Sequence, residues 1–341
     1  MRQLLYTLKH AVQKSPTLYW FLYNLATLNS DRLEQFLNCN KYPSPYGGMW
    51  TDRIDFEAEL ARRARLEGWN PEDLALLDQW RRDGYVILPQ AIAPQMIDAY
   101  RTELEAITAG KDCSLLITGA KFAGQRQYCR DAVNPNDSIR IIDDYMFNEA
   151  SRRLLFHPEI VGFLRKVFAA KPLLTQSLNF EYGSAQSYHQ DTAFVRMTSP
   201  FKLAACWIAL EDVQPGSGAL KFVPGSHQWT DFLFSGAHTH YDEERDGIAE
   251  LDRWQQWLEN KISAHAIPAK HFIAKKGDVL IWHAGLAHGG GDIENTELTR
   301  RSLVAHYCSQ GTRPLYHFYK PAFRKMYSHG QNQYTTSYYR W

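Results

Sequence analysis

Short apolar runs separated by turn residues dominate the second half of the chain. Glycine- and proline-bearing stretches, such as residues 214–218 and 289–291, lie between these runs. Several short strands with such turns are typical of an antiparallel sandwich or barrel, and not of repeated strand–helix–strand units. We therefore expect a mainly β core. Its expected strands cover residues 173–182, 203–210, 219–223, 278–282 and 302–307.

The first half of the chain shows helical patterns instead. Asn70 can cap a helix, Pro71 suits its first position, and the two acidic residues that follow favour the positive end of its dipole. This helix should run to about Arg82 and stop at Gly84. The other elements expected here are a strand over residues 85–88 and helices over residues 94–107 and 158–169.

The chain divides into three regions by composition. Residues 1–70 are expected to form a helical N-terminal extension, with a proline- and glycine-bearing turn at residues 42–48. Residues 71–315 should form the main domain, which holds the β core and the helices that precede it. Residues 316–341 are dense in aromatic side chains and should form a tail packed on the core.

Charge and cysteine content narrow the function classes. The 38 Lys and Arg nearly balance the 37 Asp and Glu, and this argues against a nucleic-acid partner, which needs a concentrated positive field. The five cysteines are widely spaced without a CxxC pair, so we expect no disulfide framework and no cysteine zinc site, and a cytoplasmic location fits best. The near-apolar stretch at residues 18–28 is too short to span a bilayer. We expect the N-terminal helices to pack on the domain or on a second copy in a homo-oligomer.

Three side chains carry candidate metal chemistry. His189 and Asp191 are two residues apart, and on a strand they would project from the same face, roughly 6–7 Å apart at their Cα atoms. His288 follows an expected strand and precedes a glycine run. Two histidines and one carboxylate leave three metal positions open, as in the facial triad of non-haem Fe(II) oxygenases. There 2-oxoglutarate would take two positions and O2 the third, and Arg300 or Arg301 could bind the distal carboxylate of 2-oxoglutarate.

Other histidines have structural interpretations. A second HxD pair, His240 and Asp242, lies in a polar stretch without a strand pattern, so we expect a solvated loop there. His227 should stabilise a turn by hydrogen bonding, and His283 should be structural. His157 should begin the helix over residues 158–169.

The chain from about residue 72 to residue 310 resembles the phytanoyl-CoA dioxygenase family of Fe(II)/2-oxoglutarate oxygenases. The matching stretches are residues 83–89, 189–191, 206–213, 218–227, 277–280 and His288 with residues 300–302. The resemblance implies a double-stranded β-helix, or cupin-like jelly roll, with flanking helices. It also implies that His189, Asp191 and His288 are the iron ligands.

The resemblance further implies a set of residues around the co-substrate. Arg300 would pair with the distal carboxylate of 2-oxoglutarate, and Trp207 would line its pocket. Gln176 and Asn179 fall near co-substrate contacts of the family. The chain departs from the family pattern at Gly290, where a serine is usual. The interval from His288 to the arginine is also about one residue longer, which leaves Arg300 and Arg301 both open.

The resulting hypothesis is an Fe(II)- and 2-oxoglutarate-dependent dioxygenase that hydroxylates an unactivated C–H bond of a small molecule and releases succinate and CO2. The carboxylate of Asp191 favours hydroxylation over halogenation, because related halogenases have a small residue there. One alternative is a metal-binding jelly-roll module without oxygenase activity. Another is a zinc-dependent hydrolase with water in the open position. Neither alternative has a use for Arg300.

A group of basic residues precedes the β core. These residues could bind an anionic group of the substrate, or they could be surface charges paired with nearby acids, namely Asp131, Asp137, Asp143 and Asp144. The group consists of Lys121, Arg126, Arg130 and Arg140.

Overall fold

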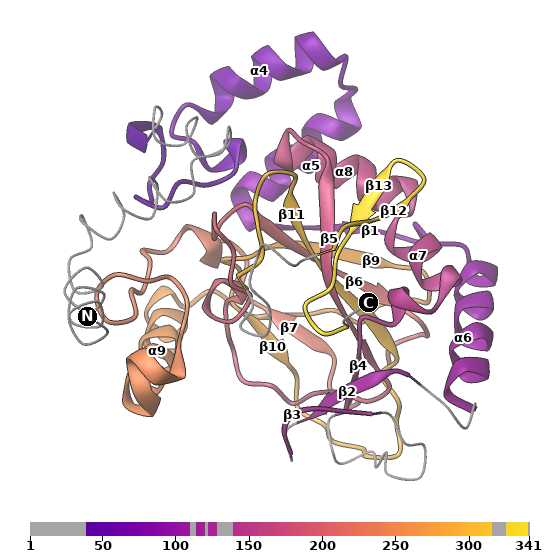
Figure 1. The fold of residues 1–341 in the computed structure, drawn as a ribbon. Helices are drawn as coiled ribbons and strands as arrows, with labels where there is room; N and C mark the ends of the chain where they lie inside the picture. Colours follow the sequence, from indigo (N-terminus) through magenta and orange to yellow (C-terminus); the bar gives the residue numbers. More distant parts are fainter. Residues whose placement is uncertain (1–38, 110–113, 120–121, 128–138, 316–324, 340–341) are drawn as a thin grey trace, which may run out of the picture.

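The computed structural model describes residues 39–109, 114–119, 122–127, 139–315 and 325–339. Most of its strands form one large sheet, shown in Figure 1. In spatial order its main path is β1 (Tyr85–Leu88), β9 (Val279–His283), β6 (Leu203–Ala209), β11 (Ser302–Ser309), β5 (Pro172–Phe180), β4 (Arg140–Ile142), β2 (Leu116–Gly119) and β3 (Phe122–Gln127). Every pairing along this path is antiparallel.

A smaller antiparallel sheet packs against the large one. It contains β10 (His288–Gly290), β7 (Leu220–Phe222) and β8 (Lys270–His271). One apolar cluster joins the two sheets, and in it the rings of Tyr85 and Phe222 lie 4.5 Å apart. The prediction of a mainly β, two-sheet core is therefore confirmed.

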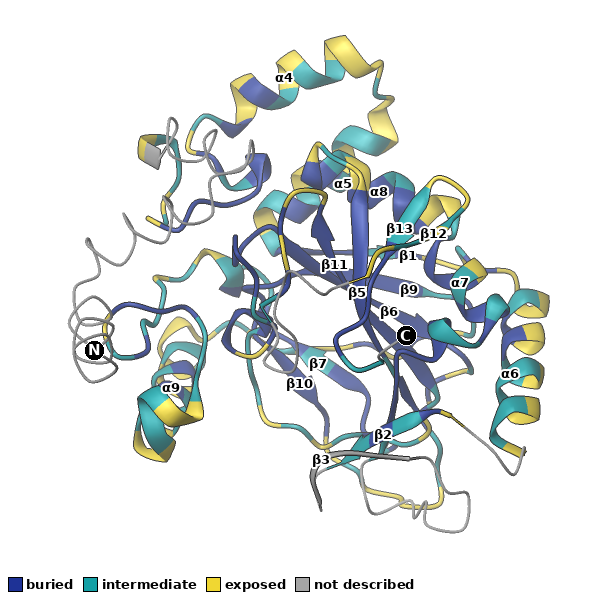
Figure 2. Cartoon of the chain, viewed as in Figure 1, coloured by how far each residue is buried: buried dark blue, intermediate teal, exposed yellow. Residues whose placement is uncertain are grey.

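Alternation along the central strands separates two buried faces. On β6, Ala205 and Trp207 face the smaller sheet, whereas Cys206 and Ile208 belong to the cluster on the other face. The same alternation places Val304 of β11 inside the jelly roll. Figure 2 shows that the central strands are buried along their whole length, as a sheet covered on both faces must be.

Helices cover the outer face of the large sheet. They are α5 (Pro71–Asp83), α6 (Pro94–Ala109), α7 (Glu149–Leu155) and α8 (Pro158–Phe168). The predicted start of α5 is confirmed, since Asn70 Oδ1 accepts from Asp73 N at 2.8 Å. Its predicted end is confirmed too, because Gly84 adopts a positive φ of 77°, which glycine tolerates best. His157 precedes α8 as its N-cap residue, as predicted.

The N-terminal extension is described only in part. Residues 1–38, which include the helices expected to contact a second copy, lie outside the described residues. From residue 39 on, the chain forms two 3₁₀ turns, η1 (Cys39–Lys41) and η2 (Trp50–Asp52), and the helix α4 (Phe56–Glu67). None of the described helices combines the length and the hydropathy that crossing a bilayer requires.

The described part of the C-terminal tail packs on the large sheet. It forms the hairpin β12 (Tyr327–His329) and β13 (Asn332–Tyr334), and β13 pairs in parallel with β5. Tyr334 is buried, with its ring 5.6 Å from that of Tyr145 in the 3₁₀ turn η5 (Asp144–Met146).

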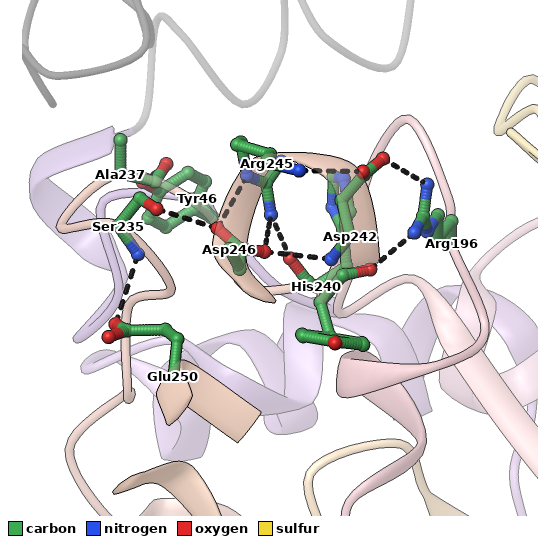
Figure 3. A network of polar contacts seen from close by, with 10 residues as sticks. Tyr46, Arg196, Ser235, Ala237, His240, Asp242, Arg245, Asp246 and Glu250 are labelled. Atoms are coloured by element: carbon green, nitrogen blue, oxygen red, sulfur yellow. Dashed lines mark hydrogen bonds and ion pairs between the residues drawn. The ribbon is translucent and has the colours of Figure 1, made fainter. Parts of the chain in front are cut away.

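A long helix, α9 (Glu243–His265), was not predicted from the sequence. His240 and Asp242 lie in a loop, as predicted, and Asp242 is the N-cap of α9. The expectation that this loop is solvated was wrong, because both residues are half-buried. Arg245 donates to His240 O, and Arg196 forms an ion pair with Asp242 at 2.9 Å. Figure 3 shows this polar network at the start of α9.

The centre of the network is Asp246, whose side chain is fully buried. Its carboxylate accepts from Arg245 Nη2 at 2.5 Å, from Ser235 Oγ at 2.6 Å and from Asp242 N at 2.7 Å. Arg245 is itself only 9% exposed in its side chain, so its charge depends on this partner.

Replacing Asp246 with Asn should therefore destabilise the fold. The substitution keeps the shape but leaves a buried arginine without its counter-charge, and we expect the free energy of unfolding to fall by about 3 kcal/mol. Chemical denaturation monitored by circular dichroism measures this loss. Arg253→Ala is the matched control, because the Arg253–Glu250 pair on the same helix exposes 70% of the arginine side chain and should contribute little. Equal stability of the two variants would contradict the role of Asp246.

Candidate metal centre and co-substrate cavity

Two backbone hydrogen bonds place His189 beside His288. His189 N donates to His288 O at 2.8 Å, and His288 N donates to His189 O at 2.9 Å. His288 begins β10, whereas His189 lies in an isolated bridge outside the named strands. The prediction that His189 and Asp191 share a strand was therefore wrong. The chain turns directly after the bridge, and Asp191 begins the 3₁₀ helix η6 (Asp191–Ala193).

Asp191 returns to the two histidines through this turn. Trp282 on β9 donates its Nε1 hydrogen to Asp191 Oδ2 at 2.9 Å. The other oxygen, Oδ1, lies 3.7 Å from His288 Nε2. The indole thus fixes the carboxylate and leaves one oxygen directed at the histidine pair.

Hydrogen bonds also orient both imidazole rings. His189 Nδ1 lies 3.0 Å from Ser187 O, and His288 Nδ1 lies 2.9 Å from Leu286 O. A carbonyl can only accept, so each Nδ1 carries the hydrogen and each Nε2 presents a lone pair. Both lone pairs belong to rings whose centroids are 4.2 Å apart.

These three side chains fit a divalent metal ion. One ligand atom from each of His189, Asp191 and His288 lies within 4.8 Å of the others, and they are the one such cluster in the described part of the chain. A neutral nitrogen pair with one carboxylate suits Fe(II) and leaves the remaining coordination positions open. The donor set, its burial and its tautomers agree with an iron site.

Electrostatics keep the site ready for a cation. Burial lowers the pKa of His189 to about 3, and neighbouring His288 lowers it further, so this imidazole is neutral at physiological pH. Burial on its own would raise the pKa of Asp191, but His288 and His306 outweigh it, so the net pKa is well below its usual range. Asp191 is therefore the one carboxylate, and an ionised one, among the described residues that line the cavity.

Arg300 lies in the same cavity as the three candidate ligands. It is 2% exposed, and its guanidinium lies 5.4 Å from the ring of Phe180 and 5.8 Å from that of Trp207. Its Nε and Trp207 Nε1 are both buried without a hydrogen-bond partner among the described residues. Burial and the nearby Arg140 lower the pKa of Arg300 to about 10. The Arg300 guanidinium and the neighbouring Trp207 indole thus each have a hydrogen-bond donor without a described partner, and a carboxylate ligand would satisfy both donors.

Arg301 points elsewhere. Its guanidinium forms ion pairs with Glu181 and Glu211, each at 3.1 Å. The sequence left both arginines open as the co-substrate anchor, and the structure brings only Arg300 into the cavity.

Two further predicted contacts are not in the cavity. Asn179 projects from the opposite face of β5, where its Nδ2 donates to the hydroxyl of Tyr100 at 2.9 Å. Gln176 lies beyond the cavity lining and donates to the hydroxyl of Tyr338 at 2.9 Å. The sequence placed both residues near the co-substrate, but in the structure neither of them lines the cavity that holds the metal cluster.

The sequence interpretation missed two polar residues of β11. His306 lines the cavity with its Nε2 3.5 Å from Asp191 Oδ1, and Ser302 is buried with an unpartnered hydroxyl. Both lie an even number of residues after Arg300, and the period of two along a strand could have identified them. A full list of the residues lining the cavity is Arg140, Leu178, Phe180, Ser184, Gln186, His189, Asp191, Trp207, Leu220, Trp282, His288, Gly289, Gly290, Arg300, Val304 and His306.

The glycine at position 290 has a steric cause. A Cβ built there would lie 2.7 Å from Ala185 N and 2.9 Å from Gln186 N. The segment before His189 therefore packs directly on the backbone of β10, and the serine usual in the family has no room here.

His227 and His283 lie away from the metal cluster. His227 Nε2 bonds Arg81 O at 3.2 Å within the turn η7 (Ser226–Gln228), as predicted. His283 ends β9, and Gly285 N donates to its Nδ1, so Nε2 carries the hydrogen that faces Asp52 at 3.4 Å. Its structural role was also predicted.

The jelly roll brings two histidines and a carboxylate into one cavity, together with an arginine that has no acidic partner among the described residues. This arrangement is typical of Fe(II)- and 2-oxoglutarate-dependent oxygenases. A family model described as "Phytanoyl-CoA dioxygenase (PhyH)" matches residues 80–302, which is more than half of the chain. The chain belongs to the phytanoyl-CoA dioxygenase family.

Similar proteins agree with this assignment. The ectoine dioxygenase of Nocardia farcinica is 24% identical over 306 residues, which cover 87% of this chain and 93% of that protein. A phytanoyl-CoA dioxygenase domain-containing protein 1 homolog of Caenorhabditis elegans is 21% identical and covers 68% of this chain and 89% of its own length. The solved structure of the epimerase SnoN in complex with Fe3+, alpha ketoglutarate and nogalamycin RO has a TM-score of 0.50 at 22% identity, covers 75% of this chain and 86% of that chain, and shares the fold.

The hydrogen bond from Trp282 to Asp191 should support metal binding. Trp282→Phe keeps the ring but removes the donor, so the carboxylate loses its fixed orientation, and we expect the affinity for Mn(II), a redox-stable substitute for Fe(II), to fall about tenfold. Electron paramagnetic resonance of free Mn(II) during titration measures this change. Trp254→Phe, a buried tryptophan of α9, is the control. Unchanged Mn(II) affinity in Trp282→Phe would contradict the role of the indole.

Buried histidines should make the metal-free protein sensitive to acid. Burial lowers the pKa of His189, His227 and His238 to about 3, below the usual 6.5. Between pH 3 and pH 6.5 the unfolded chain binds protons at these histidines that the folded protein does not bind. The free energy of unfolding therefore decreases as the pH falls from 6.5 toward 3. Burial raises the pKa of Asp143 to about 7 and also raises the pKa of Asp144 and Asp231, so these three acids act in the opposite direction. The histidines are more numerous, because burial lowers the pKa of His157 and His240 as well.

We therefore expect a smaller free energy of unfolding at pH 4.5 than at pH 7. Urea denaturation in the presence of a chelator at the two pH values measures the difference. His227→Gln should reduce the pH dependence. Equal or greater stability at pH 4.5 would show that the buried histidines do not control it.

Proposed function

We propose that this protein hydroxylates an unactivated C–H bond of a small-molecule substrate, using Fe(II), 2-oxoglutarate and O2 and releasing succinate and CO2. His189, Asp191 and His288 would hold the iron, and Arg300 would hold the distal carboxylate of 2-oxoglutarate. The observation that carries the proposal is the position of Arg300, a buried cation without a carboxylate partner among the described residues, in the same cavity as the metal cluster.

A metal site alone would also fit a hydrolase or a structural module, and Arg300 is the residue that distinguishes an oxygenase from these two alternatives. A zinc hydrolase binds its substrate through the metal and a water molecule, and a structural metal module binds no substrate. Neither function offsets the cost of burying a guanidinium without an acid. A dicarboxylate co-substrate offsets that cost, because one of its carboxylates can chelate the metal while the other meets Arg300.

The residues of the cavity would divide the work as follows. Bound iron would supply the oxidative chemistry, coupling decarboxylation of 2-oxoglutarate to oxidation of the substrate. Trp282 holds Asp191 in place, and the backbone bridge holds His189 and His288. Trp207 Nε1 and the hydroxyl of Ser302 would add hydrogen bonds for a carboxylate near Arg300. The protein thus contributes orientation and charge, with no side chain acting as nucleophile.

We also propose a cytoplasmic location. Cys206 is a buried free thiol among the described residues, and burial raises its pKa well above its ordinary value. Thiols kept reduced fit a reducing compartment.

The proposal is tested by paired arginine substitutions. Wild-type protein with Fe(II) should release succinate from 2-oxoglutarate, and Arg300→Gln should raise the KM for 2-oxoglutarate by about a hundredfold, because a buried charge-assisted pair is lost. Arg301→Gln should change this KM by less than about threefold, since that side chain has its own acidic partners outside the cavity.

Succinate release by liquid chromatography and mass spectrometry measures both effects. The assignment fails if iron-loaded, folded wild-type protein releases no succinate. The choice of anchor fails if Arg301→Gln has the larger effect.

A further inference from the structure

We propose that Arg140 binds a carboxylate of the primary substrate, so that this enzyme acts on a carboxylic acid. The inference rests on the function proposed above and goes beyond it by naming the substrate class. It stands on a second, partly buried arginine in the same cavity and on the balance of charge around it.

Arg140 lies on β4, at the cavity, and no described acidic residue pairs with it. No carboxylate of the described residues lies within ion-pair distance of its guanidinium, and its Nε is buried without a hydrogen-bond partner. Within the described part of the chain, its one side-chain hydrogen bond runs from Nη2 to Gln186 Oε1 at 3.3 Å. Burial lowers its pKa, as expected for a cation that lacks a counter-ion.

The two described acids that the sequence offered as partners, Asp143 and Asp144, are engaged elsewhere. Asp143 accepts from Ser177 N at 2.7 Å and from Thr336 Oγ1 at 2.6 Å. Asp144 accepts from the hydroxyl of Tyr100 at 2.7 Å and from Ser151 Oγ at 3.0 Å. The interpretation of Arg140 as a surface charge paired with Asp143 or Asp144 was therefore wrong. Asp131 and Asp137, the other two acids offered as partners, lie outside the described residues. Lys121 and Arg130 lie outside the described residues.

Charge balance indicates what Arg140 lacks. The described residues that line the cavity contribute two guanidinium groups and one carboxylate, that of Asp191. A divalent metal ion and a doubly charged 2-oxoglutarate neutralise each other, and Asp191 offsets one arginine. One positive charge remains in a site sheltered from water, and a monoanion would neutralise it.

The different burial of Arg300 and Arg140 indicates that they bind different ligands. Arg300 is 2% exposed at the base of the cavity, whereas Arg140 is only partly buried and lies nearer the solvent. Both guanidinium groups lie 5.4 Å from the ring of Phe180, so they share one wall. The deeper arginine suits the co-substrate that binds first, and the outer one suits the substrate that enters over it.

Gln186 connects Arg140 to the metal site. Its Oε1 accepts from Arg140, and its Nε2 lies 3.5 Å from His189 Nε2. An acid bound at Arg140 would therefore place carbon atoms a few bonds from its carboxylate near the metal. Leu178, Leu220 and Val304 line the same cavity and favour an apolar carbon skeleton.

Calorimetric titration with acetate tests the inference without knowledge of the substrate. Anaerobic protein loaded with Fe(II) and saturating 2-oxoglutarate is titrated with acetate, with neutral acetamide and with inorganic phosphate. We expect acetate to bind wild type at least about tenfold more tightly than Arg140→Gln, because a charge-assisted bidentate pair is lost. Arg140→Lys should retain intermediate affinity, acetamide should not bind, and phosphate should bind more weakly than acetate.

The visible absorption band of the Fe(II)–2-oxoglutarate chelate is recorded in each sample. It shows that each variant is folded and loaded, and it separates the two proposals. A missing band in wild type overturns the proposed function. A band that persists while acetate binds wild type and Arg140→Gln equally, or neither of them, overturns only this inference. Loss of 2-oxoglutarate binding in Arg140→Gln would assign Arg140 to the co-substrate instead, and tighter phosphate binding would replace the carboxylic acid with a phosphorylated substrate.

Discussion

The reciprocal backbone hydrogen bonds between His189 and His288 set the geometry on which the whole site depends. They join a loop that follows β5 to the first residue of β10, and so they bring together two segments far apart in the chain. With the two backbones held together, one hydrogen bond from each Nδ1 to the carbonyl of Ser187 or Leu286 selects the tautomer in which Nε2 has a lone pair for the metal. The turn of η6 then carries Asp191 back beneath the pair, where Trp282 of the large sheet holds it. The two sheets of the jelly roll thus each supply part of one metal centre.

The molecule treats its buried charges in two distinct ways. At the start of α9, Arg245 and Asp246 satisfy each other, and that network supports the fold. In the cavity, Arg300 and Arg140 have no acid among the described residues, although they are costly to bury. A protein retains such a cost where a ligand offsets it. The contrast between the paired arginine and the two unpaired ones is the main reason to regard the cavity as a binding site for anions.

Local signals made most of the fold predictable. The cap at Asn70, the stop at Gly84 and the apolar runs of the central strands correspond to α5, β6, β9 and β11. Helix α9 was not predictable in the same way, because Gly247 interrupts it and its start is held by Arg196 and Arg245 through contacts that only the tertiary fold creates. The spacing of His189 and Asp191 was informative, but the strand geometry assumed for it was not. Arg300 and Arg301 are adjacent and chemically identical, so only their different burial separates them, and burial is a property of the assembled sheets. Asn179 failed for the related reason that one residue of register moves a side chain to the other face of a strand.

The most direct test of the metal and co-substrate site is an anaerobic titration of metal-free protein with Fe(II) and then 2-oxoglutarate, followed by visible absorption. We expect a charge-transfer band that saturates at one equivalent of 2-oxoglutarate per chain. The band should be much weaker in Asp191→Ala, because this variant lacks the carboxylate that completes the cluster. Folded wild-type protein that binds Fe(II) but forms no such band, or an Asp191→Ala variant that forms it unchanged, would contradict the account.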